Sequence, residues 1–429
     1  MANEATAHRA MDATPERVTT RCCIAGGGPA GMMLGFLLAR AGVDVAVLEK
    51  HGDFLRDFRG DTVHPSTLEV LHELGLLDDF LKRPHQEVRD LVAYVGKQSV
   101  PIADLSRLPT HCKFIVLMPQ WDFLNFLAER AQRYSNFHLR MECEATDILV
   151  EGDCVKGVRA ATKRGELQVR ADLVVAADGR RSTIRAKAGF EVMTLGAPID
   201  VLWMRIPRTS SDPPQSLGRV DAGKFLVMIN RADYWQCAFV IPKGGFDAIR
   251  AAGLDRFRND IAEIAPFLSD RVGELKSWDD IKLLSVAVDR LRQWCRPGLL
   301  CIGDAAHAMS PIGGIGINLA IQDAVAAANL LSAPLRSGTV SIGDLLAVQE
   351  RRMFPTRATQ GLQVFVQDRI VTPALKSKTP IRELPVALKV LRAWPWVRRI
   401  PARVVGVGFR PEHVKTAAIG HENATPAHW

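Results

Sequence analysis

The sequence predicts an α/β protein in which a parallel sheet with flanking helices is interleaved with a second, mixed β-sheet and followed by a short C-terminal helical tail. Residues 19–25 form an apolar strand, a glycine-rich turn follows, and residues 32–40 form a helix that is apolar almost all round. A second apolar strand over residues 43–48 completes a βαβ unit of about 30 residues, as expected for a parallel pair.

Short buried strands of the same kind recur late in the chain, at residues 166–176 and 298–302. Between them, residues 200–288 change in character and contain strand candidates rich in large apolar side chains. We therefore expect interleaved domains. The βαβ domain takes residues 1–90, 119–198 and 289–371, the sheet domain takes 91–118 and 199–288, and the tail takes 372–429.

Composition narrows the class of protein. Of 429 residues, 47% are hydrophobic and 24% are charged, as is ordinary for a globular protein. The sequence contains no run of about 18 apolar residues and therefore predicts no membrane span. The charge of +8 comes from scattered basic residues, which argues against nucleic-acid binding. Eight cysteines without CxxC or other metal-like spacing predict a reducing compartment and no metal site. We expect a cytoplasmic protein that is either a monomer or a homodimer.

The first motif is the loop between strand and helix, which reads Gly26-Gly27-Gly28-Pro29-Ala30-Gly31. The glycines at 26, 28 and 31 permit a tight turn, approach of a pyrophosphate to the backbone, and close packing of the helix on the strand. The helix N-terminus offers its free N–H groups to the phosphates. Glu49, followed by Lys50, ends the second strand and is placed to bind a ribose diol. These residues predict a dinucleotide site but leave NAD and FAD equally possible.

Two aspartates favour FAD. Asp178 follows the strand at 166–176 and Asp304 follows the strand at 298–302. A carboxylate there can accept a hydrogen bond from a ribityl hydroxyl, which FAD has and NAD lacks. Beyond Asp304, the segment from Pro311 to Asn318 carries glycines at 313, 314 and 316, which let backbone amides lie against a flat ring. A helix that begins near Gly316 points its positive end at the anion that reduced flavin becomes.

These motifs, with Arg59-Gly60-Asp61-Thr62-Val63-His64-Pro65 and Pro119-Gln120-Trp121, resemble those of single-component FAD-dependent aromatic hydroxylases of the para-hydroxybenzoate hydroxylase type, over about residues 18–370. The resemblance implies that Asp178 serves both FAD and a transient nicotinamide cofactor, and that Asp304 holds the ribityl chain. It also implies roles for the following residues: Arg59 and Gln120 at the ribityl-pyrophosphate region, Ala145 in the cofactor site, and Pro311, Gly314, Gly316, Ile317 and Asn318 along the isoalloxazine.

In that family NADH or NADPH reduces the flavin, O2 adds at C4a, and the hydroperoxide passes one oxygen atom to an electron-rich ring. The protein then needs only to orient substrate, exclude water and stabilise charge, so no acid–base pair is required. We assign no side chain as catalytic. His64 and Tyr234 are the candidates for activating a phenol, although a packed or capping side chain is the commoner role for such residues.

The substrate is expected against the second sheet, where few charges occur, so we expect a hydrophobic, aromatic or polyketide-like molecule. Which side chains face the flavin depends on strand register, because one residue of slip exchanges the faces. A reductase of isoprenoid or quinone double bonds, a halogenase, and a flavin-binding protein without activity stay open as alternatives. The candidate pocket residues are Trp203, Phe225, Tyr234, Trp235, Phe239 and Pro311.

The tail after residue 372 is shorter than the thioredoxin-like domain of many larger relatives. Residues 394–405 mix two tryptophans with three arginines, which suits weak peripheral contact with a membrane surface. Two prolines interrupt this segment, so a packed tail that caps the protein is the better expectation, without stable membrane insertion.

Overall fold

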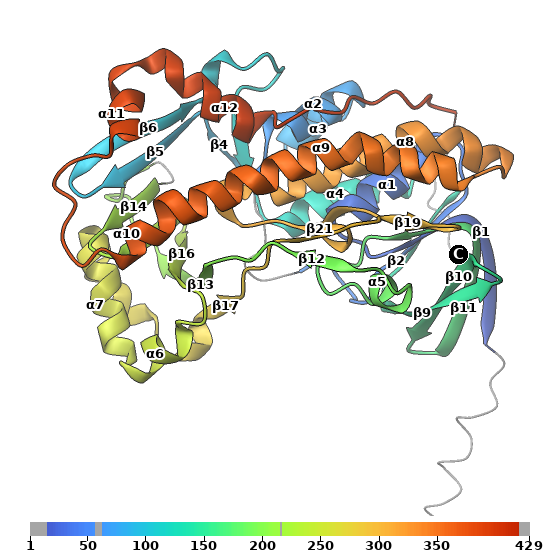
Figure 1. Ribbon diagram of the computed structural model, residues 1–429, viewed down its shortest axis with the longest axis horizontal. Coiled ribbons are helices and arrows are strands. Elements are labelled where there is room, and N and C mark those ends of the chain that lie inside the picture. The colour runs from blue at the N-terminus through green and yellow to red at the C-terminus, as the bar shows by residue number, and fades with distance from the viewer. Residues whose placement is uncertain (1–14, 56–61, 215–216, 420–429) are drawn as a thin grey trace, which may run out of the picture.

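Two large sheets and a long helix beside them organise the computed structural model, which describes residues 15–55, 62–214 and 217–419 (Figure 1). The predicted α/β class with C-terminal helices is confirmed. Arg59 lies outside the described residues.

The first sheet has eight strands, and its central part runs in the order β19-β20-β11-β1-β2-β8. From β20 to β8 all neighbours are parallel, while β9 and β10 extend β11 as an antiparallel meander. The ends of β1, β2 and β11 are entirely buried, which explains their continuous apolar sequence. The strands are β1 (Glu16–Ala25), β2 (Val45–Leu48), β8 (Phe137–Arg140), β9 (Cys143–Glu151), β10 (Cys154–Thr162), β11 (Gly165–Ala176), β19 (Cys295–Arg296) and β20 (Leu299–Cys301).

Helices α1, α4 and α8 pack together beside this sheet and share its hydrophobic core. Residues 65–81 form two helices, α2 and α3, because Gly75 adopts a positive φ of 69° and ends the first of them. Helix α8 contains a stretch long and apolar enough to cross a membrane, but 72% of it is buried inside the protein, as in a core helix. The helices are α1 (Pro29–Arg40), α2 (Pro65–Glu73), α3 (Leu77–Leu81), α4 (Gln120–Ala131), α5 (Thr183–Lys187) and α8 (Gly316–Ser337).

The second sheet has seven strands in the order β17-β13-β16-β15-β14-β5-β6. One face packs against α6 (Phe246–Ala251) and α7 (Leu254–Ile264), and the other packs against Ile312 and Val371. Two smaller sheets, β12-β18-β21 and β3-β7-β4, accompany it, and β7 therefore pairs outside the seven-stranded sheet. The strands are β5 (Asp90–Val95), β6 (Gln98–Asp104), β13 (Ile199–Pro207), β14 (Leu217–Asp221), β15 (Lys224–Asn230), β16 (Tyr234–Pro242) and β17 (Lys282–Leu284), with β3 (Thr62–Val63), β4 (Gln86–Val88), β7 (Ile115–Leu117), β12 (Val192–Thr194), β18 (Asp289–Leu291) and β21 (His307–Ala308).

Helix α9 (Ile342–Val366) is the longest in the described chain and crosses the molecule from the region of α8 to α10 (Thr372–Lys376) (Figure 1). Hydrophobic periodicity did not predict it, because its buried face is polar. That face carries Arg352, Thr356, Thr359, Gln360 and Gln363.

The tail folds back over the N-terminal half of the chain. Helix α11 (Val386–Ala393) packs on β6, and α12 (Arg399–Gly406) packs beside β6 and residues 105–108. Further on, His413 contacts Glu73 of α2, and Ile419 N–H donates to the carbonyl of Arg40 at the end of α1. The expectation of a packed tail agrees with these contacts.

Candidate cofactor and active site

The glycine loop between β1 and α1 has the packing that its sequence implies. A Cβ on Gly26, whose φ is +108°, would lie 2.4 Å from the carbonyl oxygen of Ala177, and one on Gly31 would lie 1.9 Å from that of Gly26. A Cβ on Gly28 would meet no described atom within 4 Å. Gly26 and Gly31 therefore serve the fold, whereas Gly28 borders open space. Pro29, at the first helical position, and buried Ala30 complete the turn into α1, whose N-terminal amides face the same region.

Glu49 lies at the end of β2 beside this loop. Its Oε2 accepts a hydrogen bond of 3.0 Å from the N–H of Gly27, and its Oε1 accepts one of 3.1 Å from that of His51. The side chain is buried, while neighbouring Lys50 is exposed. The carboxylate is thus fixed next to the loop.

Asp178 is held in the turn that follows β11, next to the end of β1. Its Oδ2 accepts from the N–H of Ile184 at 3.2 Å, and burial raises the pKa of the carboxyl. Its Oδ1 is buried and has no hydrogen-bond partner among the described residues. A buried acceptor without a donor is costly, so this atom fits a hydroxyl or amide donor from a bound molecule.

Arg185 joins the two aspartate turns and was not singled out from the sequence. Its guanidinium donates to the carbonyl of Arg180 at 2.6 Å and to that of Ala305 at 3.2 Å. Asp304 lies in the 3-10 turn Gly303–Ala305, and its Oδ2 is 3.5 Å from a guanidinium nitrogen of Arg180. The structure therefore brings the turns at 178 and 304 together, although 126 positions separate them in the sequence.

The loop Pro311–Gly316 reaches the N-terminus of α8 through two glycines with positive φ, 80° at Gly313 and 63° at Gly314. A Cβ on Gly314 would lie only 2.6 Å from Oγ1 of Thr62. Asn318, one of the residues expected beside the isoalloxazine, uses its side chain instead to hold α2, because its Oδ1 accepts from the N–H of His64 at 2.9 Å and from Thr67 Oγ1 at 2.7 Å. Gly316 and Ile317 form the first turn of α8.

Glutamines of α9 hold the same loop from its other side. Gln363 Nε2 donates to the carbonyls of Ser310 and Ile312 at 2.9 and 3.0 Å, and its Oε1 accepts from the N–H of Ser310. Gln360 donates to the carbonyls of Asp289 and Ala308. No local motif signals these residues, because they lie some 50 positions from the loop that they fix.

His64 is completely buried at the start of α2, beside Gly314. Its Nδ1 lies 2.7 Å from the carbonyl oxygen of Val405 in α12, so Nδ1 carries the proton and donates it. Desolvation lowers the pKa to about 4, which keeps the ring neutral near pH 7, and Nε2 has no partner among the described residues. The tail thus sets the tautomer of this histidine.

Strand alternation divides the expected pocket residues between the two faces of the seven-stranded sheet. Trp203 and Phe225 lie on the face that packs against Ile312, next to Pro311. Tyr234 shares this face but lies at the far end of β16, with the guanidinium of Arg205 5.1 Å from its ring centre. Trp235 and Phe239 lie on the opposite face, buried under α7, so their assignment to the pocket is corrected: the register of β16 gives them a structural role.

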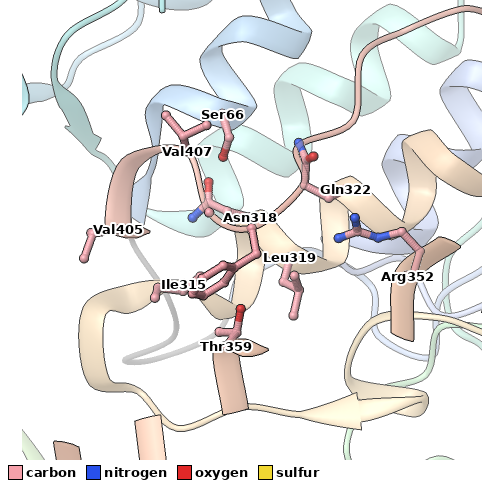
Figure 2. A pocket seen from close by; sticks show the side chains of 11 residues that line it. Ser66, Ile315, Asn318, Leu319, Gln322, Arg352, Thr359, Val405 and Val407 are labelled. Atoms are coloured by element: carbon pink, nitrogen blue, oxygen red, sulfur yellow. The ribbon is translucent and has the colours of Figure 1, made fainter. Parts of the chain in front are cut away.

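A buried polar network lies behind the loop. Asp323 of α8 accepts from His307 at 2.6 Å, from Nε of Arg352 at 2.9 Å and from the N–H of Gly303 at 3.1 Å. Glu412 of the tail pairs with Arg352 and with Arg351. A cavity of about 20 Å³ lies beside this network, lined by residues of α8, α9 and 405–409. Figure 2 shows Gln322 and Arg352 among the side chains that line it. Its size suits about one water molecule.

The FAD binding domain family matches residues 19–361 of the chain. The chain belongs to this family of FAD-dependent monooxygenases. A 6-methylpretetramide 4-monooxygenase of Streptomyces rimosus is 32% identical over 90% of this chain and 92% of its own length. A para-nitrophenol 4-monooxygenase of Pseudomonas sp. is 25% identical over 77% of this chain and 82% of its own length. The crystal structure of a p-nitrophenol 4-monooxygenase from Pseudomonas putida has a similar fold, with a TM-score of 0.71, 21% identity, and coverage of 91% of this chain and 99% of that one.

The described residues fit FAD as the resident cofactor. The open space at Gly28, the carboxylate of Glu49 fixed beside it, and the buried Oδ1 of Asp178, which has no hydrogen-bond partner among the described residues, lie at the ends of parallel strands of one sheet. Use of NADH or NADPH is typical of the family. The individual cofactor contacts, among them those expected of Gln120 and Ala145, stay predictions.

Proposed function

We propose that the chain hydroxylates a hydrophobic aromatic or polyketide-like substrate, with FAD bound and with NAD(P)H and O2 consumed. The observation that carries this proposal is the apolar sheet face with Trp203 and Phe225, which packs toward the loop Pro311–Gly316. The Streptomyces relative, whose name gives 6-methylpretetramide as the compound it oxygenates, supports it. Relatives named as monooxygenases make the halogenase alternative less favoured.

Bound flavin supplies electron transfer from NAD(P)H and the activation of O2. In the proposed site Gly28 and the N-terminus of α1 would bind the pyrophosphate, Glu49 would bind the ribose, and Asp178 and Asp304 would bind hydroxyl groups farther along. The backbone of residues 311–317 would hold the ring, and the N-terminus of α8 would stabilise negative charge there. We assign the β1 sheet with its helices to cofactor binding and the seven-stranded sheet to substrate binding.

The tail closes this site on one side. Val405 packs with Ile229, whose side chain is on the same sheet face as Trp203, and its carbonyl holds His64. We propose that His64 positions the loop at Gly314 and excludes water from it. A pKa of about 4 makes the ring a weak base, and its buried Nε2 faces the loop, so proton transfer is not its role.

The outer side of the tail exposes Trp394 and Trp396 beside Arg399. We propose that it allows at most weak peripheral contact with an anionic membrane, and that the enzyme works in the cytoplasm. Flotation with vesicles that contain anionic lipid tests this, with Trp394→Ser/Trp396→Ser as the comparison. Stable, salt-resistant binding of the original chain would contradict it.

The decisive experiment is a substrate screen on the purified, FAD-loaded protein. Phenols and aromatic polyketides are added to enzyme, NAD(P)H and air, and NAD(P)H oxidation, peroxide and product mass are followed. We expect a substrate that accelerates NAD(P)H oxidation and gains one oxygen atom, labelled when ¹⁸O2 is supplied. A protein that does not bind FAD, or turnover that continues without O2, would refute the proposal, and the second result would indicate a reductase.

A further inference from the structure

Gln236 is a buried polar side chain on the apolar face of the seven-stranded sheet. Because side chains alternate along β16, Gln236 lies on the same face as Ala238 and Val240, and it is only 4% exposed. Its cross-strand neighbours are Arg205 in β13 and Ile229 in β15. A polar group buried on this face needs hydrogen-bond partners for both ends of its amide.

The orientation of the Gln236 amide is fixed by Arg231. Oε1 of Gln236 accepts a hydrogen bond of 3.0 Å from Nε of Arg231. A guanidinium can only donate, so the amide oxygen faces Arg231 and the NH2 group faces the other way. The Nε2 atom makes no hydrogen bond with the described residues. Gln236 therefore presents a free N–H donor on this face of the sheet.

This donor lies between two places where the cofactor side of the protein meets the sheet. On one side, Ile312 of the glycine-containing loop belongs to the same hydrophobic cluster as Trp203. On the other side, Val405 of the tail belongs to the same cluster as Ile229, the neighbour of Gln236 in β15. A molecule held between the loop, the tail and the sheet face would therefore meet the free amide group of Gln236.

The neighbours of the amide decide which ligand group it suits. Ala238 and Ile229 are apolar, and the side chains of Trp203 and Arg205 can only donate hydrogen bonds. A ligand hydroxyl would find a donor in Gln236 but no acceptor for its own hydrogen among these side chains. A carbonyl oxygen needs donors only. The amide therefore suits a carbonyl oxygen better than a hydroxyl group.

We propose that Gln236 is a specificity-determining residue whose Nε2 donates a hydrogen bond to a carbonyl oxygen on the edge of an aromatic substrate. This inference rests on the proposed function, because it places the substrate on the same sheet face. It narrows the substrate from any hydrophobic ring to one that carries a ketone or quinone carbonyl. The hydrogen bond fixes how the ring is turned in its plane, while Trp203 and Phe225 supply apolar contact.

The test measures binding to the oxidised, FAD-loaded protein without NAD(P)H, so that it does not depend on turnover. The probes are 1-hydroxyanthraquinone and 1-hydroxyanthracene, which share a three-ring skeleton and a hydroxyl group and differ in the carbonyl oxygens. Quenching of protein and flavin fluorescence gives both dissociation constants. We expect 1-hydroxyanthraquinone to bind roughly tenfold more tightly than 1-hydroxyanthracene, because only the former satisfies the amide.

Gln236→Glu separates the donor from the contact with Arg231. The carboxylate still accepts from Arg231, but an oxygen that repels a carbonyl replaces the NH2 group. We expect 1-hydroxyanthraquinone to bind roughly tenfold more weakly or worse, and binding of 1-hydroxyanthracene, bound FAD and the thermal midpoint to change little. Gln132→Glu, exposed at the end of α4, makes the same chemical change and is the matched control, with both constants unchanged.

Gln236→Met is the second variant, because it removes the donor without adding a charge. It should also abolish the preference for 1-hydroxyanthraquinone. Binding of neither probe by the original chain, an unchanged preference in Gln236→Glu, or equal weakening of both probes would overturn the proposal, and an unchanged preference would mean that Gln236 only holds Arg231. Selective binding without oxygenation of any compound in the substrate screen would refute the proposed function and leave the role of Gln236 in recognition standing.

Discussion

Replacement of Asp323 by Asn should destabilise the protein strongly, although the side chain keeps its size. Asp323 is completely buried and accepts from Arg352, His307 and the backbone of Gly303. Burial acts to raise its pKa, but the contacts with His307 and Arg352 outweigh burial and lower it. The carboxylate is therefore charged in the native state and balances the buried guanidinium of Arg352.

The size of the effect follows from those contacts. Removal of one partner of a buried ion pair costs about 3–5 kcal/mol, and Glu412, 3.4 Å from Arg352, still offsets part of the charge. We expect a loss of about 3 kcal/mol in the free energy of unfolding. Because the N–H of Gly303 loses a charged acceptor, the turn with Asp304 loosens, and FAD should bind roughly tenfold more weakly.

Urea unfolding at pH 7, followed by circular dichroism with and without FAD, measures the first quantity, and fluorescence titration of FAD measures the second. Asp247→Asn, at an exposed carboxylate on α6, is the matched control and should change stability by less than about 0.5 kcal/mol. A loss below about 1 kcal/mol for Asp323→Asn, with FAD affinity unchanged, would show that the network neither stabilises the fold nor supports the turn.

Three further predictions follow from the site. The pKa of His64 is lowered to about 4, so as the pH falls the unfolded state binds a proton before the folded state does, and the free energy of unfolding decreases between about pH 6.5 and pH 4. His64→Gln should make the decrease in this free energy between pH 7 and pH 5 smaller by about 2 kcal/mol. An unchanged pH profile of urea unfolding would contradict this. Gly31→Ala should yield unfolded protein, because the new Cβ overlaps the carbonyl of Gly26. Gly28→Ala should fold with a similar thermal midpoint and bind FAD roughly tenfold more weakly. Equal effects of the two substitutions on folding and on FAD affinity would refute that distinction. Trp203→Ala should raise the KM for the substrate with little change in stability, while Trp235→Ala should lower the free energy of unfolding by about 3–5 kcal/mol. Steady-state kinetics and thermal unfolding measure the two effects. A destabilised Trp203→Ala with a stable Trp235→Ala would refute the assignment of the faces.

Features that depend on neighbouring residues could be predicted from the sequence. The βαβ unit, the turn of Gly26–Gly31 and the acid at Glu49 all lie within about 30 positions, and glycines report backbone conformation directly. The aspartates at 178 and 304 could be found because each follows the apolar end of a buried strand, residues 173–176 and 299–301.

Other features depend on partners that are remote in the chain. The pocket face was uncertain because alternation tells which residues share a face, but not which face meets the loop; Trp235 and Phe239 were misplaced for that reason. Helix α9 was missed because periodicity searches for apolar residues on the buried side, where this helix has Arg352 and Gln363. The partners of that polar side, such as Asp323, can be named only once the fold is known.

The order of strands in the first sheet has a consequence for synthesis on the ribosome. Strand β11 pairs with β1 on one side, whereas on the other side its residues 165–170 pair with β10 and its residues 174–176 pair with β20. Strand β20 is translated more than 120 residues after β11. Until it emerges, the apolar end of β11 at residues 174–176 has an open edge that can pair with other chains. Expression yield should therefore depend on translation speed and chaperone supply over the interval that encodes residues 177–301, even though the finished protein has no such edge at β11.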